Sequence, residues 1–467
     1  MRSEAAVRPT LPTLLMLSAA TLGLSCGSAR AQTMSADEAA ALRAEIASLK
    51  AQLQRMEQKL EAAVAAPPPV ATSAPVPAEP APAPAATEIS WKGSPQLSSD
   101  GRTFKAKGRI QADAGYVTHP NGLSDRGLGY AAEMRRIRLG GEGSLSKAFG
   151  YKLELELSDN AVDLVDTFVT WKNGPWHLAL GNQNQFQALD ELTGDTTGST
   201  MERAAFTDAF NFERRLGLSA QYEKADWLLQ AGLFADDIDA LANSADGPDG
   251  GDENNSYGVD GRVVYAPKLG RTQLHLGASA HWRDLKRLSE AGTRYAQRPY
   301  LHTSNSRLIG TGVLDVRDEA HYGVEAAFVR GPLHGAAEAH WLESDLAIGP
   351  TPRFFGGYAE LGYFFTGETR GYGGGIFERT KTARPLGAGG FGALQASLRY
   401  DYLDMNDRGV VGGRQDAWIA ALIWQPIDYL RFNLNHGWLS YGDAVPLANG
   451  DRSYRVRTTG ARMELDF

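Results

Sequence analysis

Apolar and polar residues alternate along most of this chain from residue 104 to its last residue, 467, and this period of two restricts the fold more than any other feature. Successive side chains of a β-strand point to opposite faces, so each such segment predicts a strand with one apolar and one polar side. In the last segment, 454–467, the apolar side carries Ala461, Met463, Leu465 and Phe467. Charged residues occupy the positions between them.

Sixteen segments share this alternation. They are residues 104–117, 133–145, 149–158, 162–172, 176–184, 214–222, 227–234, 257–265, 272–283, 321–330, 333–343, 354–366, 391–403, 415–425, 428–440 and 454–467. No convincing long helix interrupts them, so the pattern predicts an all-β fold. Both a soluble β-protein and a membrane barrel contain strands of this kind, and other features must decide between them.

The polar sides of these strands favour a membrane barrel, because they carry many full charges, which suit a water-filled lumen better than a sandwich exterior. These charges include Arg136, Arg138, Glu156, Asp166, Arg262, Glu325, Arg399 and Arg431. Eight of the nine tryptophans lie near the ends of the expected strands, where aromatic girdles meet lipid headgroups. They are Trp171, Trp176, Trp227, Trp282, Trp341, Trp418, Trp424 and Trp438.

The connections between the expected strands also alternate in length. LSKA, KNGP, EKAD, PKLG, RGP and QPID are short, whereas residues 185–211, 235–256 and 284–318 are long. Short periplasmic turns and long outer loops are typical of outer-membrane barrels. We therefore expect a 16-stranded antiparallel transmembrane β-barrel whose C-terminal strand closes beside the first one and leaves no free edge.

The connection formed by residues 367–390 does not fit this pattern. Counting from the first strand places it on the periplasmic side, where turns are short. Either it is an unusual turn or one hairpin is wrongly placed, so eighteen strands remain an alternative.

Residues 1–31 have the features of a secretory signal peptide. Two arginines precede the apolar stretch 14–24, and we expect cleavage after Ala31. A lipoprotein signal that uses Cys26 is the alternative, although Gly23 stands where such signals have a larger aliphatic residue. Cleavage at Ala31 leaves a mature chain without cysteine, so no disulfide contributes to its fold.

Residues 32–65 are the expected coiled-coil segment. Hydrophobic residues spaced alternately by four and three occupy its a and d positions, namely Leu42, Ile46, Leu49, Leu53, Met56 and Leu60. A coiled coil needs partner chains; a single amphipathic helix packed on its own domain is the alternative. Residues 66–90, rich in Pro and Ala, form an extended linker to the barrel domain, residues 91–467.

The barrel domain contains the stretches EMRRIRLGGEGSL, YKLELELSDNAVDLVDTFVTWK, LALGNQNQFQALDELTG with TMERAAFTDAF, YFFTGETRGYGGGIFERTK, and LRYDYLDMND followed by the final strands. Together these stretches resemble one family, the phosphate-selective porins O and P of Gram-negative outer membranes. The resemblance implies a homotrimer of 16-stranded barrels in the outer-membrane bilayer, with the coiled coil in the periplasm. It also implies passive uptake of phosphate, pyrophosphate or other anions, and a third outer loop, roughly residues 185–211, folded into the pore.

Members of the family bind phosphate with lumen arginines, and the adjacent arginines of EMRRIR correspond to Arg135 and Arg136 here. With Ile137 and Leu139 facing lipid, Arg136 and Arg138 face the lumen, and we expect Arg135 near a membrane interface because an arginine that faces lipid is costly. The expected anion path consists of Arg109, Arg136, Arg138, Arg215, Arg262, Arg399 and Arg431. Guanidinium groups suit phosphate oxygens, and a row of weak sites lets an ion move on.

The expected constriction loop departs from the family, in which lysines line the constriction. It contains Asp190, Glu191, Asp195, Glu202 and Asp208, with Arg203 as its one basic residue. Negative charge near a pore neck repels anions. The residues therefore leave two alternatives open: a phosphate-binding lumen, or lumen arginines that only shape the field of a general porin.

The C-terminal residues suggest how the barrel is assembled. Alternating apolar residues that end in an aromatic one are what outer-membrane proteins of this kind present. We therefore expect Met463, Leu465 and Phe467 to be the signal that the barrel-assembly machinery recognises.

Other kinds of site are less well supported by the sequence. The acidic loop 235–254 lacks the spacing of an EF-hand and is expected to be a solvated surface loop rather than a calcium site. His275, His281 and His340 fall on polar strand faces, where we expect lumen lining rather than metal ligands. We find no HExxH, GxSxG or phosphate-binding GxxxxGK[ST] motif, and we expect no cofactor.

Three function classes follow from these observations. A porin is favoured; the alternative is a general porin that also tethers the outer membrane to the cell wall through its coiled coil, and an outer-membrane barrel enzyme is less favoured. The balance of 47 basic to 55 acidic residues gives no indication of nucleic-acid binding.

Overall fold

The computed structural model describes residues 50–51, 54, 87–158, 162–235, 237–238, 256–285 and 292–467. The expected signal peptide, the linker up to residue 86 and most of the acidic loop 235–254 lie outside the described residues. Within the expected coiled coil only Lys50, Ala51 and Gln54 are described, and they are helical. The coiled coil and its partners therefore remain predictions. No helix among the described residues is long and apolar enough to cross a membrane.

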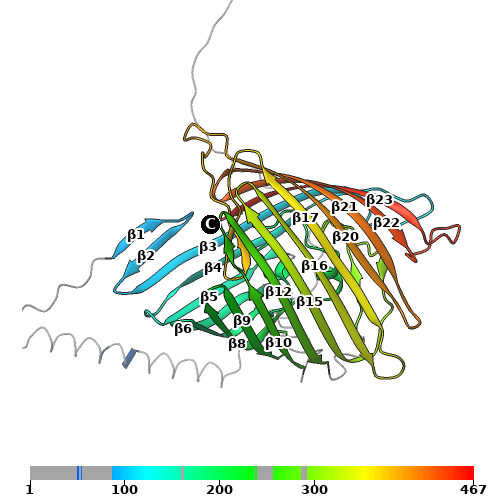
Figure 1. The fold of residues 1–467 in the computed structure, drawn as a ribbon, viewed down its shortest axis with the longest axis horizontal. Helices are drawn as coiled ribbons and strands as arrows, with labels where there is room; N and C mark the ends of the chain where they lie inside the picture. The colour runs from blue at the N-terminus through cyan, green and yellow to red at the C-terminus, as the bar shows by residue number, and fades with distance from the viewer. Residues whose placement is uncertain are drawn as a thin grey trace, which may run out of the picture. The chain divides into compact units, whose positions relative to one another are not determined.

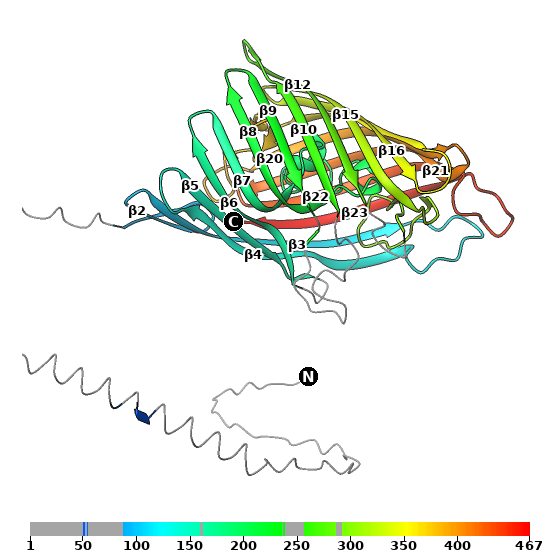
Figure 2. The same cartoon turned by 90° about the horizontal axis from the view of Figure 1, so that it is seen from below.

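Sixteen antiparallel strands form the wall of a closed barrel, and each of the sixteen predicted segments coincides with one of them (Figures 1 and 2). They are β3 (Arg102–Val117), β4 (Gly129–Ser144), β5 (Phe149–Glu156), β6 (Asp163–Asn173), β7 (Trp176–Asn184), β8 (Arg214–Lys224), β9 (Trp227–Phe234), β10 (Tyr257–Tyr265), β12 (Thr272–Asp284), β15 (Val316–Arg330), β16 (Leu333–Leu346), β17 (Arg353–Phe364), β20 (Ala393–Asp407), β21 (Val410–Ile427), β22 (Leu430–Gly442) and β23 (Tyr454–Asp466). The all-β barrel fold is thus confirmed.

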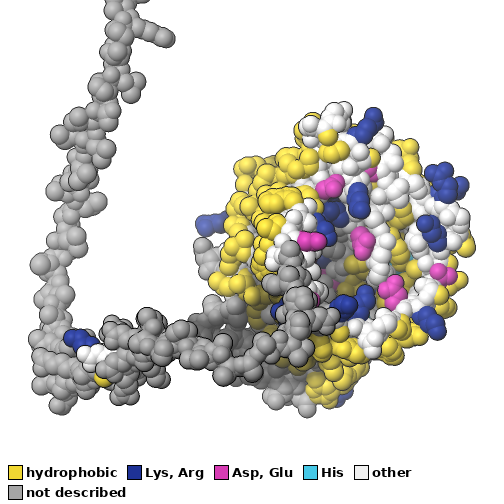
Figure 3. Space-filling view, turned by 90° about the vertical axis from the view of Figure 1, so that its left-hand side faces the viewer, with side chains coloured by type: hydrophobic (Ala, Val, Ile, Leu, Met, Phe, Trp, Pro, Cys, Tyr) yellow, Lys and Arg dark blue, Asp and Glu magenta, His cyan; other side chains and the backbone are white. Residues whose placement is uncertain are grey.

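Along the membrane-spanning part of the wall, the burial of side chains is the reverse of that found in a soluble protein. In β9 the outward residues Leu229 and Leu233 are 47% and 61% exposed, whereas the inward residue Gln230 is only 7% exposed. Charged residues such as Arg262 and Glu325 are likewise buried on the inward faces of their strands. The view in Figure 3 shows hydrophobic side chains over the outer wall and charged ones within the barrel mouth. This arrangement suits a wall between lipid and an aqueous lumen.

Aromatic pairs lie across neighbouring strands at both ends of the wall. Trp176 packs against Tyr222, and Trp227 against Tyr265, at the end where the chain enters and leaves the barrel. At the opposite end Trp282 packs against Tyr257. Aromatic residues at the two ends of the strands mark the two levels at which the barrel wall crosses the membrane–water interfaces.

The last strand closes the barrel as the sequence predicts. In β23, Arg462 and Glu464 face inward and Met463 faces outward, and Ala461 lies opposite Ala114 of β3. Beyond the strand, the backbone of Phe467 exchanges two hydrogen bonds of 3.0 Å with Gly108. The ring of Phe467 lies over Gly108 so closely that a Cβ there would come within 2.3 Å of it.

Deleting Phe467 is expected to reduce the amount of folded barrel in the outer membrane. The deletion removes two backbone hydrogen bonds and the packed ring, which together stabilise the closure by about 2–4 kcal/mol. Unboiled gel electrophoresis of membrane extracts, in which a folded barrel migrates faster than the boiled chain, measures the effect. Phe365→Ala is the control, since Phe365 is an outward aromatic away from the closure; equal amounts of folded protein in both variants would contradict the prediction.

Two short strands outside the barrel wall explain why residues 367–390 form a long connection at the end where the turns are short. Residues 365–392 join β17 to β20, which pair directly with each other. Within them β18 (Gly371–Gly373) and β19 (Ile376–Glu378) form a separate hairpin that does not enter the barrel sheet. The barrel therefore has sixteen strands rather than eighteen, and 365–392 is a long inward turn. The remaining pieces are the hairpin β1 (Glu88–Trp91) and β2 (Pro95–Ser99), which extends β3, the two-residue β11 (Lys268–Leu269), and the pair β13 (Ala296–Gln297) and β14 (Ile309–Gly310).

Candidate functional site

The loop between β7 and β8, residues 185–213, folds into the barrel as expected for the constriction loop. It contains two short helices, α2 (Leu189–Leu192) and α3 (Ala205–Ala209). Glu338 on the wall accepts hydrogen bonds from the first backbone N–H groups of α2, at 2.9 and 2.7 Å. Asp401 accepts one from Ala205 at 3.1 Å, at the start of α3. Two lumen carboxylates are thus used to hold the loop rather than to face the pore.

An apolar core inside the lumen fixes the same loop from its other side. Phe206 of α3 is fully buried and stacks on the ring of His340 at 4.3 Å. Residues of the loop 285–315, including the buried Tyr295 and Leu301, belong to the same apolar cluster. It packs against inward apolar residues of the wall such as Leu403. Sequence reasoning missed this core, because it assigned the lumen to polar side chains alone.

Asp195, an acidic residue of the loop, lies between two of the predicted lumen arginines. Its carboxylate oxygens contact Arg109 Nη1 at 2.5 Å and Arg136 Nε at 2.9 Å. Burial opposes the ionisation of Asp195, but the two guanidinium groups hold its pKa well below the ordinary value. Asp195 is therefore a charged anchor for the loop, and its negative charge is balanced by the wall.

Other acidic loop residues are paired in the same way. Glu202 Oε1 contacts Arg462 Nη2 at 2.5 Å. Burial opposes ionisation of Glu202, but Arg462 lowers its pKa to about 2. Asp190 contacts Arg399 at 3.2 Å. The acidic loop thus neutralises arginines of the wall instead of presenting free negative charge.

Two loop residues, Glu191 and Arg203, pair with each other at 3.3 Å rather than with the wall. Burial raises the pKa of Glu191 above its ordinary value, although Arg203 acts against the shift. The carboxylate of Glu191 is therefore compensated within the loop, by Arg203. The fifth acidic residue, Asp208, accepts a hydrogen bond of 2.7 Å from the backbone N–H of Arg298.

Arg135 does not lie where the sequence predicts, because a β-bulge in β4 shifts its position. Gln111 of β3 pairs with Arg136, whereas the next residue, Ala112, pairs with Met134, so one extra residue is inserted into β4. Before the bulge Met134 faces outward, and after it Ile137 and Leu139 take the lipid side. Both adjacent arginines therefore line the lumen cavity, and Arg135 does not lie at a membrane interface.

The remaining predicted arginines all lie on inward faces of strands and are engaged by the protein. Arg138 contacts Glu154 and Glu156 at 3.1 and 2.7 Å. Arg262 makes a forked contact with Glu325 at 2.6 and 2.9 Å. Two further members, Arg215 and Arg431, contact Glu213 at 3.0 Å and Gly198 O at 2.9 Å, respectively. These pairs anchor the loop and wall, and only part of the predicted row reaches the cavity.

The cavity left between the constriction loop and the wall has a volume of about 860 Å³. Its lining contains thirteen arginines and lysines and nine aspartates and glutamates, a net charge of +4, although the whole chain has a net charge of −8. Arg135, Arg294 and Arg307 line it without a carboxylate within ion-pair distance among the described residues. The cavity therefore offers uncompensated guanidinium groups to a mobile ion.

Two of these arginines, Arg294 and Arg307, belong to the loop 285–315, which sequence reasoning did not assign to the pore. Burial, together with the like charges of Arg298 and Arg294, lowers the pKa of Arg307. His302 of the same loop contacts Glu133 of β4 at 2.8 Å, which brings the loop to the strand that carries Arg135. A bound anion would relieve the repulsion among these arginines.

The inward turn 365–392 reaches the cavity from the other end of the barrel. Arg370 donates to Thr197 O of the constriction loop at 2.9 Å and to Glu360 of the wall at 3.3 Å. Phe377 is buried beneath it, with the Arg370 guanidinium 3.6 Å above its ring. Three segments distant in sequence thus enclose one charged cavity.

Comparisons with known proteins agree with this architecture. The family model described as phosphate-selective porin O and P matches residues 104–467. A protein of Caulobacter vibrioides, described only as an uncharacterized protein, is 67% identical over 99% of this chain and 97% of its own length. Porin O of Pseudomonas aeruginosa is 26% identical over 69% of this chain and 78% of its own. The trimer form of OmpT of Vibrio cholerae is similar in fold alone, with a TM-score of 0.50 and 10% identity over 79% of this chain and all of that one.

Proposed function

The chain belongs to the phosphate-selective porin O and P family and is an outer-membrane porin, and we propose that its channel admits small hydrophilic anions, phosphate and pyrophosphate among them, by passive diffusion. The family and the fold indicate a channel rather than an enzyme. The proposal rests on one observation: the cavity has a positive net charge, and the guanidinium groups of Arg135, Arg294 and Arg307 line it without a carboxylate partner among the described residues.

The pairing of the acidic loop supports an anion path despite the loop's sequence. Negative charge at a constriction repels anions only when it is uncompensated. Here Asp195 and Glu202 are each held by wall arginines at 2.5 Å. The remaining free charges on the passage are positive, and they favour a phosphate ion whose oxygens match the guanidinium fork.

Reversal potentials of the wild-type channel in planar bilayers test the proposal. In a potassium chloride gradient we expect the sign that corresponds to anion preference, and added phosphate should reduce chloride current in a saturating manner because it occupies the guanidinium sites for longer. Bilayers that receive boiled protein are the control. A cation-selective current that is indifferent to phosphate would reject the anion channel and favour the alternative, a general porin that also tethers the outer membrane to the cell wall.

Two further proposals concern assembly and orientation. We propose that three chains form a homotrimer, which unboiled electrophoresis of the detergent-extracted protein would reveal as a heat-labile band. The short turns and both ends of the barrel domain would then face the periplasm, with the N-terminal coiled coil beside them. Assembly through the machinery that recognises Met463, Leu465 and Phe467 is tested by the deletion described above.

A further inference from the structure

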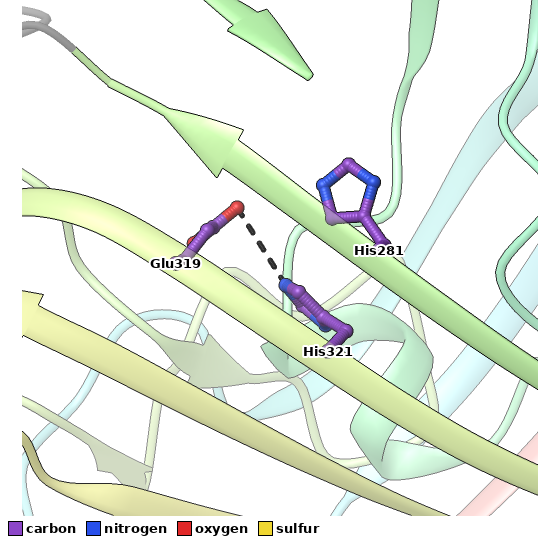
Figure 4. A group of neighbouring side chains, drawn as sticks. All are labelled: His281, Glu319 and His321. Atoms are coloured by element: carbon purple, nitrogen blue, oxygen red, sulfur yellow. Dashed lines mark ion pairs between the residues drawn. The ribbon is translucent and has the colours of Figure 1, made fainter. Parts of the chain in front are cut away.

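Three metal-ligating side chains meet on the inner wall outside the lining of the cavity described above. His281 of β12 and His321 of β15 lie directly opposite each other in the strand register, and Glu319 precedes His321 on the same face. All three are buried, with 3%, 3% and 8% of their surfaces exposed. Figure 4 shows the two rings and the carboxylate turned toward one another.

The donor atoms of this cluster lack other partners. His281 Nε2 and both ring nitrogens of His321 are buried without a hydrogen bond among the described residues. Buried polar atoms are rarely left without a partner, and these three nitrogens are available to a ligand. One ligand atom from each of the three residues lies within 4.8 Å of the others, and His321 Nε2 is 3.6 Å from Glu319 Oε1. Donors of a tetrahedral zinc ion, with bonds of about 2.0–2.1 Å, are separated by about 3.4 Å, so small side-chain movements complete the site.

The surrounding residues orient these donors as in known metal sites. Asp260 Oδ1 contacts His281 Nδ1 at 2.6 Å, which leaves Nε2 as the free donor. Tyr295 donates a hydrogen bond of 2.8 Å to Glu319 Oε2, which leaves Oε1 toward His321. Carboxylate–histidine contacts of this kind fix the tautomer of a ligating imidazole.

We propose that His281, His321 and Glu319 bind one divalent transition-metal ion of the zinc class. Two imidazoles and one carboxylate suit Zn²⁺, Co²⁺ or Ni²⁺ and not Mg²⁺ or Ca²⁺, which prefer oxygen ligands. Apart from its ligands, the ion would lie near the ring of Phe212, whose centroid is 5.4 Å from that of His321.

The ion would connect the two ends of the constriction loop. Asp260 Oδ2 accepts a hydrogen bond of 2.8 Å from the backbone N–H of Phe186, at the beginning of the loop. Phe212, near its end, packs on His321. Metal binding would thus fix the loop to the wall through Asp260 and His321, in addition to the ion pair of Asp195.

Zinc titration of the untagged, metal-stripped full barrel tests this site. We expect one Zn²⁺ per chain, and we expect His321→Gln and Glu319→Gln each to weaken the affinity at least tenfold. His275→Gln is the matched control: His275 is on the same face of β12, but its two ring nitrogens already contact Tyr372 and Glu325. Absence of stoichiometric binding, or unchanged affinity in the two folded ligand variants, would overturn the proposal.

X-ray absorption of the zinc-loaded wild-type protein decides the case if a ligand variant fails to fold. The proposal requires two imidazole nitrogens in the first coordination shell of zinc, together with oxygen ligands. A shell that contains oxygen alone would overturn it, because it would indicate binding to surface carboxylates.

Discussion

Replacing Arg135, Arg294 and Arg307 together with Gln is expected to abolish the anion preference that we propose for the channel. These residues supply the guanidinium groups of the cavity that no described carboxylate balances. A hydrogen bond to a charged group contributes about 1.5–3 kcal/mol, so losing one such contact should raise the half-saturating phosphate concentration about tenfold or more. Reversal potentials and phosphate block of chloride current measure both effects.

A triple variant with the same change in net charge is the control. Arg317, Arg353 and Arg408 have side chains that are 63%, 52% and 59% exposed, and none of them lines the cavity. Their replacement by Gln should leave the reversal potential within the wild-type range. Equal shifts in the two triple variants would show that overall charge, rather than the cavity, sets the selectivity.

Asp195→Asn is expected to loosen the constriction loop and to increase anion current. The substitution leaves Arg109 and Arg136 without their shared carboxylate, and breaking a buried ion pair of this kind costs on the order of 3–5 kcal/mol. The substitution removes one negative charge from the cavity, because Arg136 loses its carboxylate and Arg109 keeps only Asp466, at 3.5 Å. The loosened loop would also widen the opening. Single-channel conductance and reversal potential should therefore both move in the direction of greater anion flow.

Glu343→Gln is the control for this variant, because Glu343 pairs with the exposed Arg353 at 3.5 Å outside the cavity. It removes one carboxylate of an ion pair and should leave conductance unchanged. A rise in cation preference after Asp195→Asn would contradict the interpretation that the acidic loop is an anchor. Unchanged conductance would show that the ion pair does not hold the loop.

The sequence by itself determined the strands and their two faces, whereas the choice of sixteen strands over eighteen needed the direct pairing of β17 with β20. A strand repeats every two residues, so local alternation alone distinguishes the lipid side from the lumen side, as at Arg462, Met463 and Glu464. The same rule predicts that Arg136 and Arg138 face the lumen, and both line the cavity in the structure. The rule misplaced Arg135, because a bulge depends on the register with the neighbouring strand and not on local spacing.

Tertiary structure alone decided what each charge does. Asp195 is 86 residues from Arg109 and was expected to repel anions, yet the fold brings the two into contact. His281 and His321 are opposite each other only because β12 pairs with β15 across a long connection. Pairing energy depends on distance and burial, which the order of residues does not encode. The alternation therefore determined the barrel, whereas the inward segments determined which of its charges remain free.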